Sequence, residues 1–369
     1  MGGRDAFEVE AKPEGLFLPA LGLWLDPRVP VDRAFVSHAH ADHHWGAAQS
    51  QGVVLGSRET IALLEARRRA KLDGARALAW DGWIEVRVDE AHGGGTARLS
   101  IAPAGHVLGA AQLVVEHGDR KLVYTGDFQS GGGLTHASGA PVACDALIVE
   151  STFGLPIFRF PDRVATRARI VEWCRRALDA GELPVLLGYA LGKSQELVRA
   201  CLDAGLPVVA HGAVHVVCAA YESLGVDLGV RDGRLVPYAK WSEAKETKRA
   251  PAVIVAPPQA QGQPMIRKMK SARVAYVSGW ALIDAAVEQR RADAGFVLSD
   301  HADYDDLMAT IAATGARRVH VTHGDDVEVL ARLVHDALDV EAIPLPLPPI
   351  DAPSEPATTE ASAPTEEGA

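Results

Sequence analysis

The chain has 369 residues, of which 48% are hydrophobic, and a formal net charge of −11. This composition supports a substantial core, either in two domains or in one large layered domain. No apolar run approaches the ~20 residues that cross a bilayer, and the first five residues lack the apolar segment of a secretory signal. We therefore expect a folded cytoplasmic protein with no membrane partner.

The acidic excess lies largely at the C-terminus. Residues 340–369 carry six acidic and no basic side chains, which leaves a net charge of −5 for the remainder. Because residues 344–369 are rich in Pro, Ala, Thr and Glu and can bury little apolar surface, we expect a disordered acidic tail there. Net charge therefore does not exclude a nucleic-acid partner for the body of the chain.

The body carries four groups of basic residues. Each group is expected to be either a solvated helix face or part of a groove that binds a nucleic-acid backbone. The groups are Arg67–Arg69 with Lys71, Lys240–Arg249, Arg267–Lys270, and Arg290 with Arg291.

The four cysteines have neither CxxC spacing nor neighbouring histidines. This spacing disfavours a zinc ribbon and a disulfide framework, and it predicts buried thiols. The four are Cys144, Cys174, Cys201 and Cys218.

Short β-rich runs separated by turn signals dominate the chain up to Glu150, and one helix is expected at about Arg58–Lys71. This pattern predicts a first domain made mostly of sheet. The expected strands are Ala34–Val36, Val53–Leu55, Ile84–Val88, Ala97–Ile101, Gln112–Val115, Leu122–Tyr124 and Ala146–Val149.

From Asp162 onward, helices and strands alternate, which favours a parallel α/β unit inserted into the first domain. Strand-like runs at Phe296–Ser299 and Val319–Thr322, on either side of a helix at about Tyr304–Thr314, indicate a return to the first domain. Within the insert we expect helices at Val164–Ala180 and Gly192–Ala204, and strands at Pro184–Leu187, Pro207–Ala210, Ala252–Ala256 and Val274–Ser278.

The tripeptide Gly192-Lys193-Ser194 follows a strand and precedes a helix, as a phosphate-binding loop would. That motif requires a glycine five residues before Gly192, and position 187 is leucine. We therefore do not predict a nucleotide site there.

The densest concentration of metal-binding side chains directly follows an apolar strand. His38, His40, Asp42, His43 and His44 fall within seven consecutive positions, and imidazole and carboxylate groups are good ligands for divalent metals. A single histidine is usually a core or surface residue, but so many behind one strand predict a dinuclear metal centre.

Further polar residues stand at the ends of other strand-like runs. His106, Asp127, His301 and His323 each lie beside glycine or another small residue, which allows the backbone to turn tightly. Glu150 ends the apolar run before it. We expect all five side chains to converge on the cleft that holds the histidine cluster.

These motifs resemble those of a known family. The first three motifs are similar to the metal motifs of the metallo-β-lactamase fold, and the last three are similar to the extra motifs of its β-CASP nuclease branch. The matching residues, in order, are His38-Ala-His40-Ala-Asp42-His43, His106 and Asp127, and then Glu150, His301 and His323.

Within that branch, the chain is most similar to bacterial DNA ligase-associated exonucleases, which are mRNA 3′-end processing factor-like proteins. The segments that carry this resemblance are Pro103–Gln112, Glu150–Pro156, Tyr189–Gln195, Ala256–Pro258, Ser278–Trp280 and Leu298–Asp303.

The resemblance implies an α/β fold, namely a metallo-β-lactamase αββα sandwich with an inserted α/β β-CASP cap domain. The first part of the metallo-β-lactamase domain would cover residues 1–154, and the insert residues 155–295. Residues 296–343 would be the return segment, and residues 344–369 the disordered acidic tail.

The resemblance also implies a role for each motif residue. A hydroxide between two divalent metals would attack phosphorus, and His301 would protonate the leaving oxygen. Glu150 would orient His301, with Asp300 and Asp303 as weaker candidates for that support. Lys193, at a helix N-terminus, is a tentative contact for a substrate phosphate.

The metals would be two zinc ions, with manganese or iron as alternatives. The implied ligands are His38, His40 and His106 for one metal, Asp42, His43 and His323 for the other, and Asp127 as a bridge. The implied catalytic residues are Asp42, Asp127, Glu150 and His301.

The function expected from this resemblance is a DNA exonuclease of DNA repair, associated with an ATP-dependent DNA ligase and a helicase of the same pathway. The alternative is an RNase, because RNA-processing relatives carry histidine at the position of His323 whereas crosslink-repair relatives usually carry valine. The longer motifs favour DNA over RNA. The complete ligand set and the insert disfavour a non-catalytic scaffold and a small-molecule metallo-hydrolase.

Overall fold

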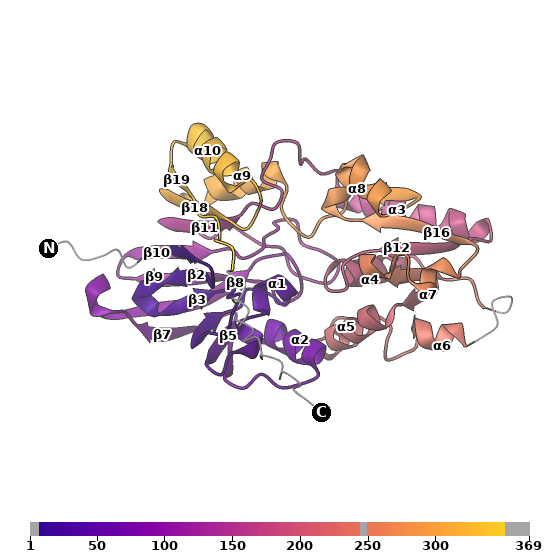
Figure 1. Ribbon diagram of the computed structural model, residues 1–369, viewed down its shortest axis with the longest axis horizontal. Coiled ribbons are helices and arrows are strands. Elements are labelled where there is room, and N and C mark those ends of the chain that lie inside the picture. Colours follow the sequence, from indigo (N-terminus) through magenta and orange to yellow (C-terminus); the bar gives the residue numbers. More distant parts are fainter. Residues whose placement is uncertain (1–6, 244–248, 351–369) are drawn as a thin grey trace, which may run out of the picture.

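A computed structural model describes residues 7–243 and 249–350 of the protein. Most of the predicted acidic tail, and the centre of the basic run Lys240–Arg249, lie outside the described residues. Figure 1 shows two lobes, of which one contains the N-terminal and C-terminal parts of the chain and the other contains its middle. No helix among the described residues has the length and apolar character needed to cross a bilayer.

The first lobe is built on two sheets, with strand orders β1-β2-β3-β4-β5-β6 and β19-β18-β11-β10-β9-β8-β7. In the second sheet, β7 to β10 pair antiparallel, whereas β10, β11, β18 and β19 pair parallel. The strands of the first sheet are β1 (Glu10–Lys12), β2 (Gly15–Leu18), β3 (Leu23–Leu25), β4 (Arg33–Phe35), β5 (Val53–Ser57) and β6 (Ala75–Leu78). Those of the second are β7 (Trp83–Arg87), β8 (Thr96–Pro103), β9 (Ala111–His117), β10 (Arg120–Tyr124), β11 (Ala146–Glu150), β18 (Arg318–Thr322) and β19 (Glu341–Pro344).

The pattern of side chains explains where each strand lies. The strand β11 reads Ala-Leu-Ile-Val-Glu and is buried along its whole length, as expected of a central strand covered on both faces. Near its start, β8 alternates exposed and buried residues, because only one of its faces points into the core. The core between the two sheets includes Leu16 and Phe35 from one side and Leu113 and Tyr124 from the other.

Helices cover the outer face of each sheet and complete an αββα sandwich. Leu307 and Leu330 of α9 and α10 pack with Val149 and Val321 of the second sheet, and Figure 1 shows these helices above β18 and β11. On the other side, α2 packs on the first sheet. The helices of this lobe are α1 (Ala41–His44), α2 (Arg58–Arg68), α9 (Tyr304–Thr314) and α10 (Val327–Leu338).

The second lobe is the inserted cap, a parallel sheet with strand order β14-β13-β15-β12-β16-β17 and helices on both faces. Its strands are β12 (Leu183–Leu187), β13 (Val208–Ala210), β14 (Leu235–Pro237), β15 (Val253–Ala256), β16 (Ala272–Val277) and β17 (Ala294–Phe296). Its helices are α3 (Arg163–Asp179), α4 (Lys193–Asp203), α5 (Gly212–Ser223), α6 (Tyr238–Ser242), α7 (Pro264–Arg267) and α8 (Asp284–Gln289). The fold class predicted from the sequence is therefore confirmed.

A shared hydrophobic core joins the two lobes. Leu63 and Leu64 of α2 belong to the same buried cluster as Val217 and Tyr221 of α5, and these two helices contact each other. Burial of this kind stabilises by about 25 cal/mol per Å² of apolar surface. The cap is therefore packed against the sandwich rather than tethered to it by linkers alone.

Two details differ from the sequence predictions. The strand expected at Phe296–Ser299 lies at Ala294–Phe296 and pairs with β16, so it ends the cap sheet and is not part of the sandwich. The predicted domain limit after residue 295 therefore falls inside β17. The strands β1 to β3, β6, β14 and β19 were not predicted, because runs of three or four residues give too short a pattern to recognise.

The described start of the predicted acidic tail is also packed, not disordered. Pro344 ends β19, and the amide of Leu345 donates to the carbonyl oxygen of Val321 at 2.7 Å. Arg28 donates to the carbonyl oxygen of Pro348 at 2.8 Å. The predicted boundary at 344 is therefore too early, because residues just after β19 are still hydrogen-bonded to the sandwich.

The cysteine prediction is confirmed for three of the four thiols. Cys174, Cys201 and Cys218 are buried, whereas Cys144 is half-buried, and all four are free.

Candidate metal centre

Residues far apart in the sequence meet at one edge of the sandwich because several strands end there. His38 and His40 lie in the turn between β4 and α1, His106 follows β8, Asp127 follows β10, and His323 follows β18. The sequence expectation that these side chains converge is confirmed by their distances, which are given below.

Two glycines make these turns possible. Gly105 has φ 77° and Gly126 has φ 56°, a region that favours glycine. A Cβ atom on Gly126 would lie 2.5 Å from the Cβ of Ser37, and one on Gly105 would lie 1.9 Å from the carbonyl oxygen of Gln129. Each glycine directly precedes a site residue, so the close approach of two turns depends on the missing side chains.

Three imidazoles and one carboxylate form the tightest group of potential ligands. The Nδ1 atom of His40 lies 3.0 Å from Nε2 of His38 and 2.9 Å from Nε2 of His106. Oδ2 of Asp127 lies 3.5 Å from His38 Nε2 and 3.6 Å from His106 Nε2. All four ligand atoms lie within 4.8 Å of one another, and this set of donors fits a divalent metal ion.

The other ring nitrogen of each histidine is fixed by a hydrogen bond. His106 donates from Nδ1 to the carbonyl oxygen of Asp300 at 2.9 Å, and His40 from Nε2 to that of Leu191 at 3.1 Å. The oxygen of Ser37 accepts from His38 Nδ1, since its own proton goes to Asp26. The lone pairs that remain therefore face the shared space, as metal-binding histidines require.

Burial keeps these three histidines neutral. It lowers the pKa of His40 to about 4 and lowers the pKa values of His38 and His106 well below the ordinary range. Neighbouring histidines lower the pKa values of His38 and His106 further. Because a metal binds neutral imidazole, this part of the centre needs to lose no proton when a metal enters.

A second part of the centre surrounds His43. Its Nε2 atom lies 3.3 Å from Oδ1 of Asp127 and 3.7 Å from Oδ2 of Asp42. Burial would lower its pKa, but the charges of Asp127 and Asp26 raise the pKa of His43 to about 10. The imidazole ring of His323 stacks on that of His43 with 5.2 Å between centroids.

The expected ligands Asp42 and His323 are less closely gathered than the others. Among the described residues, the groups of ligand atoms that lie within 4.8 Å of one another include neither of them. The side chain of Asp42 is 80% exposed. His323 is half-buried, and desolvation together with the neighbouring His43 lowers its pKa to about 4. Its φ of 48° is unusual for a residue other than glycine.

Sequence reasoning missed Asp26, which is 2% exposed and organises the second part of the centre. Its carboxylate accepts from the amide and hydroxyl of Ser37 at 2.7 and 2.6 Å, from His43 Nδ1 at 2.8 Å and from the hydroxyl of Tyr124 at 2.7 Å. It directly follows β3, so the rule that located the other site residues, a polar residue at the end of an apolar run, applies to it as well.

Conversely, His44 of the cluster takes no part in the centre. It is buried, and neither of its ring nitrogens has a hydrogen-bond partner among the described residues. Burial lowers its pKa to about 4.

His301 and Glu150 form a pair beside Asp127. Nδ1 of His301 donates to the two carboxylate oxygens of Glu150 at 3.0 and 2.9 Å, and its Nε2 lies 3.8 Å from Asp127 Oδ2. Burial would lower the pKa of His301, but the charges of Glu150 and Asp127 raise it to about 9. His301 is therefore protonated at neutral pH in the metal-free protein, with its second N–H directed into the centre.

Asp303, the weaker candidate, does not contact His301. Its carboxylate accepts from the amides of Asp306 and Phe160 at 2.9 and 2.7 Å, which caps the start of α9 and ties down the loop before α3.

Lys193 is buried and paired rather than open to a substrate. It lies at the N-terminus of α4 as predicted, but it is 1% exposed and donates to Oδ1 of Asp300 at 2.6 Å. Glu196, one turn later, pairs with Arg163 and Arg167 of α3. This buried network positions Asp300, whose carbonyl oxygen holds His106, so α3 and α4 of the cap support a residue of the centre.

The centre opens into a cleft of about 820 Å³ between the sandwich and the cap. His40, Asp127 and His301 lie at the sandwich wall, and Tyr189 and Trp280 contribute aromatic rings from the cap. Leu347, from the segment after β19, also lines it. A cleft with a wall on each side suits an extended substrate.

Comparison with known proteins agrees with this geometry. Residues 2–170 match the family model described as the metallo-β-lactamase superfamily. The chain therefore contains a metallo-β-lactamase domain. Histidine and aspartate side chains that can bind a metal lie together at the edge of the sheets. The centre of this metallo-β-lactamase domain is therefore a site for divalent metal ions.

Three relatives are similar to this chain, and the first two cover too much of it to be confined to the sandwich. A probable DNA ligase of Opitutus terrae is 35% identical over 333 residues, which cover 89% of this chain and 30% of the relative. An RNase J-like protein of Methanocaldococcus jannaschii is 24% identical over 73% of this chain and 72% of its own length. Cleavage and polyadenylation specificity factor subunit 3 of Dictyostelium discoideum is 28% identical over 46% of this chain and 24% of its own length.

The metallo-β-lactamase chain thus spans less than a third of the Opitutus relative. These relatives confirm the resemblance to the β-CASP branch that the sequence motifs predicted.

Proposed function

We propose that the protein is a metal-dependent DNA exonuclease that cleaves phosphodiester bonds at DNA ends. One observation carries this proposal: the His38, His40, His106 and Asp127 cluster shares a cleft with a protonated His301. Phosphodiester hydrolysis needs metal ligands, here three neutral imidazoles and a carboxylate, beside a proton donor.

In this proposal His38, His40 and His106 would hold one metal, and Asp42, His43 and His323 would hold the other. Asp127 would serve both, since its oxygens face histidines of both groups at 3.3 to 3.6 Å. The donor set favours zinc, and manganese or iron suit similar ligands. Bound divalent metals supply a hydroxide nucleophile at neutral pH and neutralise charge on phosphate oxygens.

The side chains of the protein supply proton transfer and positioning. His301 donates a proton from Nε2 to the departing sugar oxygen, because its raised pKa keeps it protonated at neutral pH. Glu150 accepts from Nδ1 at 2.9 Å and fixes the ring so that Nε2 points into the cleft. Lys193 acts through Asp300 on the position of His106, and it is assigned no substrate phosphate because its ammonium group is buried.

The proposal favours DNA over RNA on two grounds. A segment similar to 89% of this chain occurs in a relative named a probable DNA ligase, so a nuclease of this kind and a ligase can share one polypeptide. The longer sequence motifs point the same way. RNA is the alternative, because His323 is present and another relative is named an RNase J-like protein.

We further propose that the protein works in DNA repair in the cytoplasm, with an ATP-dependent DNA ligase and a helicase as partners. Four free cysteines among the described residues suit a reducing compartment.

The decisive experiment is digestion of sequence-matched, end-labelled DNA and RNA oligonucleotides by the metal-loaded protein. The proposal expects stepwise shortening of DNA and slower cleavage of RNA. Faster cleavage of RNA would establish the RNase instead. Hydrolysis of a lactam or thioester without cleavage of either nucleic acid would refute a nuclease altogether.

A further inference from the structure

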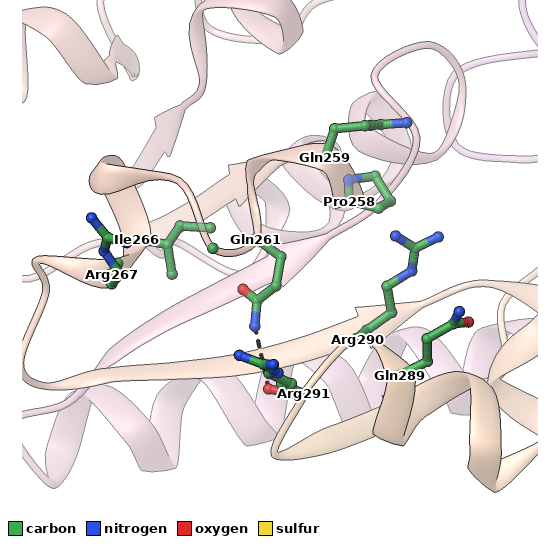
Figure 2. Close-up of a pocket in the computed structure, with 9 residues that line it drawn as sticks. Pro258, Gln259, Gln261, Ile266, Arg267, Gln289, Arg290 and Arg291 are labelled. Carbon is green, nitrogen blue, oxygen red and sulfur yellow. Dashed lines mark hydrogen bonds between the residues drawn. The ribbon is translucent and has the colours of Figure 1, made fainter.

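A second cavity, of about 510 Å³, lies on the cap. Three arginines line it, together with three glutamines and no acidic residue. Figure 2 shows that they come from two segments that are separate in the sequence, one around α7 and one at the end of α8. A cavity lined by cations in a chain of net charge −11 is a local exception to the charge of the protein.

The arginines of this cavity are available to a ligand. Among the residues that the structure describes, Arg267, Arg290 and Arg291 form no ion pair with a carboxylate. Nearby Asp293 is engaged elsewhere, since its Oδ2 accepts from the amide of Val274 at 2.7 Å. Arginine presents a planar fork of donors that matches phosphate oxygens.

The cavity wall is held in place by local contacts. Gln261 donates to the carbonyl oxygen of Arg291 at 3.3 Å, a bond that joins the two segments in Figure 2. Arg291 has φ 47°, where glycine or asparagine is usual after a helix. The guanidinium of Arg290 lies 5.7 Å from the ring centroid of Tyr276 and, in Figure 2, points toward Pro258.

This cavity adjoins the metal cleft. Gln259 lines both of them. A second connection runs through side chains, because Tyr189 lines the cleft and interacts with Tyr276. The ring of Tyr276 in turn contacts the guanidinium of Arg290. Tyr189 is 42% exposed and Trp280 36%, so the path between the cavities offers aromatic faces on which bases can stack.

We propose that the arginine cavity of Arg267, Arg290 and Arg291 binds backbone phosphates of the same single DNA strand whose end lies in the metal cleft. This inference rests on the proposed function and adds to it a second contact point on the substrate. The strand runs from the metals past Tyr189 to the cap surface at Gln259. Short substrates that end before the cavity do not reach the arginines.

The test is the dependence of kcat/KM on substrate length, measured with the metal-loaded full chain and single-stranded oligonucleotides of about four and about twenty nucleotides. In Arg290→Gln/Arg291→Gln, kcat/KM for the long substrate is expected to fall about tenfold. The kcat/KM for the short substrate is expected to stay unchanged. For the long substrate, the slope of log(kcat/KM) against log salt becomes shallower by about 0.7 for each phosphate that the variant no longer binds.

Two variants serve as controls. Arg290→Lys/Arg291→Lys keeps the charges and is expected to restore most of the activity on the long substrate. Arg87→Gln/Arg98→Gln removes the same charge from β7 and β8 of the sandwich, which is the other lobe in Figure 1, and is expected to change nothing.

Equal losses on both lengths would overturn the inference, because they indicate a structural role for the arginines. So would an unchanged length dependence, or an equal loss in the β7–β8 control. These outcomes leave cleavage intact and are distinct from failure of the proposed function, in which no oligonucleotide is cut. In that case, fluorescence anisotropy of a labelled long oligonucleotide still compares the same variants.

Discussion

The two parts of the metal centre use the same residue type but hold it in opposite ways. Backbone carbonyls accept from the ring N–H groups of His40 and His106. Carboxylates accept from those of His43 and His301. Each side has one buried and one half-buried histidine, so the difference lies in the partner.

That difference decides where the protons are. A carbonyl partner does not offset the cost of burying a charge, so the pKa of His40 falls to about 4. A carboxylate partner offsets that cost, so the pKa values of His43 and His301 rise to about 10 and about 9. We call the part around His40 and His106 the carbonyl part, and the part around His43 and His301 the carboxylate part. The histidines of the carbonyl part are neutral and ready to bind metal, whereas those of the carboxylate part hold protons.

Asp127 joins the two parts, so its loss has the largest expected effect. Asp127→Ala should abolish phosphodiester cleavage and lower the metal content, because its carboxylate faces both groups of histidines. Metal analysis and an oligonucleotide assay measure this, with Asp325→Ala, another carboxylate of the cleft, as control. Two tightly bound metals with near-normal turnover would show that Asp127 is not the bridge.

The second prediction separates proton delivery from metal binding within the carboxylate part. His301→Ala should keep both metals and lose about 10²–10⁴-fold in turnover, the usual worth of general acid catalysis. His323→Ala should weaken one metal site and respond to added metal. The two variants are compared across a metal titration, and rescue of His301→Ala instead would mean that the two roles are reversed.

The third prediction concerns the support of the carbonyl part. Lys193→Met leaves Asp300 as an uncompensated buried charge and should lower the free energy of unfolding by about 3–5 kcal/mol. Metal affinity should fall with it, because the carbonyl of Asp300 holds His106. Arg159→Met breaks a solvent-exposed pair with Asp305 and should lower the free energy of unfolding far less. Similar urea midpoints for both variants would argue against this account.

The fourth prediction is a pH effect in the carboxylate part. Activity requires protonated His301, so it should fall as the pH rises through about 9. Glu150→Gln removes the charge that raises this pKa, and the alkaline limb should move to lower pH. A pH–rate profile of kcat measures the shift. If the alkaline limb did not move, the group that titrates there would not be His301.

The smallest expected effect is a count of protons. At pH 8, filling the site at His43 should release about one proton, since its pKa lies near 10 and metals bind neutral imidazole. Filling the site of His38, His40 and His106 should release none from its histidines. Calorimetric titrations in two buffers of different ionisation enthalpy give this number. Equal release from both sites would remove the distinction between the two parts.

Much of the centre followed from the sequence because its residues obey a local rule. His106, Asp127 and Glu150 each end an apolar run, so the strand pattern alone brings them to one sheet edge. Asp26 obeys the same rule but was missed, because β3 has three residues and gives no pattern of its own.

The misassigned residues show where local reasoning stops. Lys193 was placed correctly at the start of α4, yet only the packing of α4 against Asp300 buries its ammonium group. The tail boundary failed for a similar reason, because the pairing of β19 with β18 joins segments that no local pattern connects.

The sequence by itself determined the fold, the ligand types and the strand ends that carry them, since these depend on hydrophobic periodicity and on turns a few residues long. Only the tertiary structure decided which histidines are protonated and which are neutral. A pKa depends on burial and on the charges beside the group, and Glu150 reaches His301 across 151 residues of chain. Only the folded cap brings Arg267 into one cavity with Arg290 and Arg291, because the two segments are separate in the sequence and meet only through tertiary contacts.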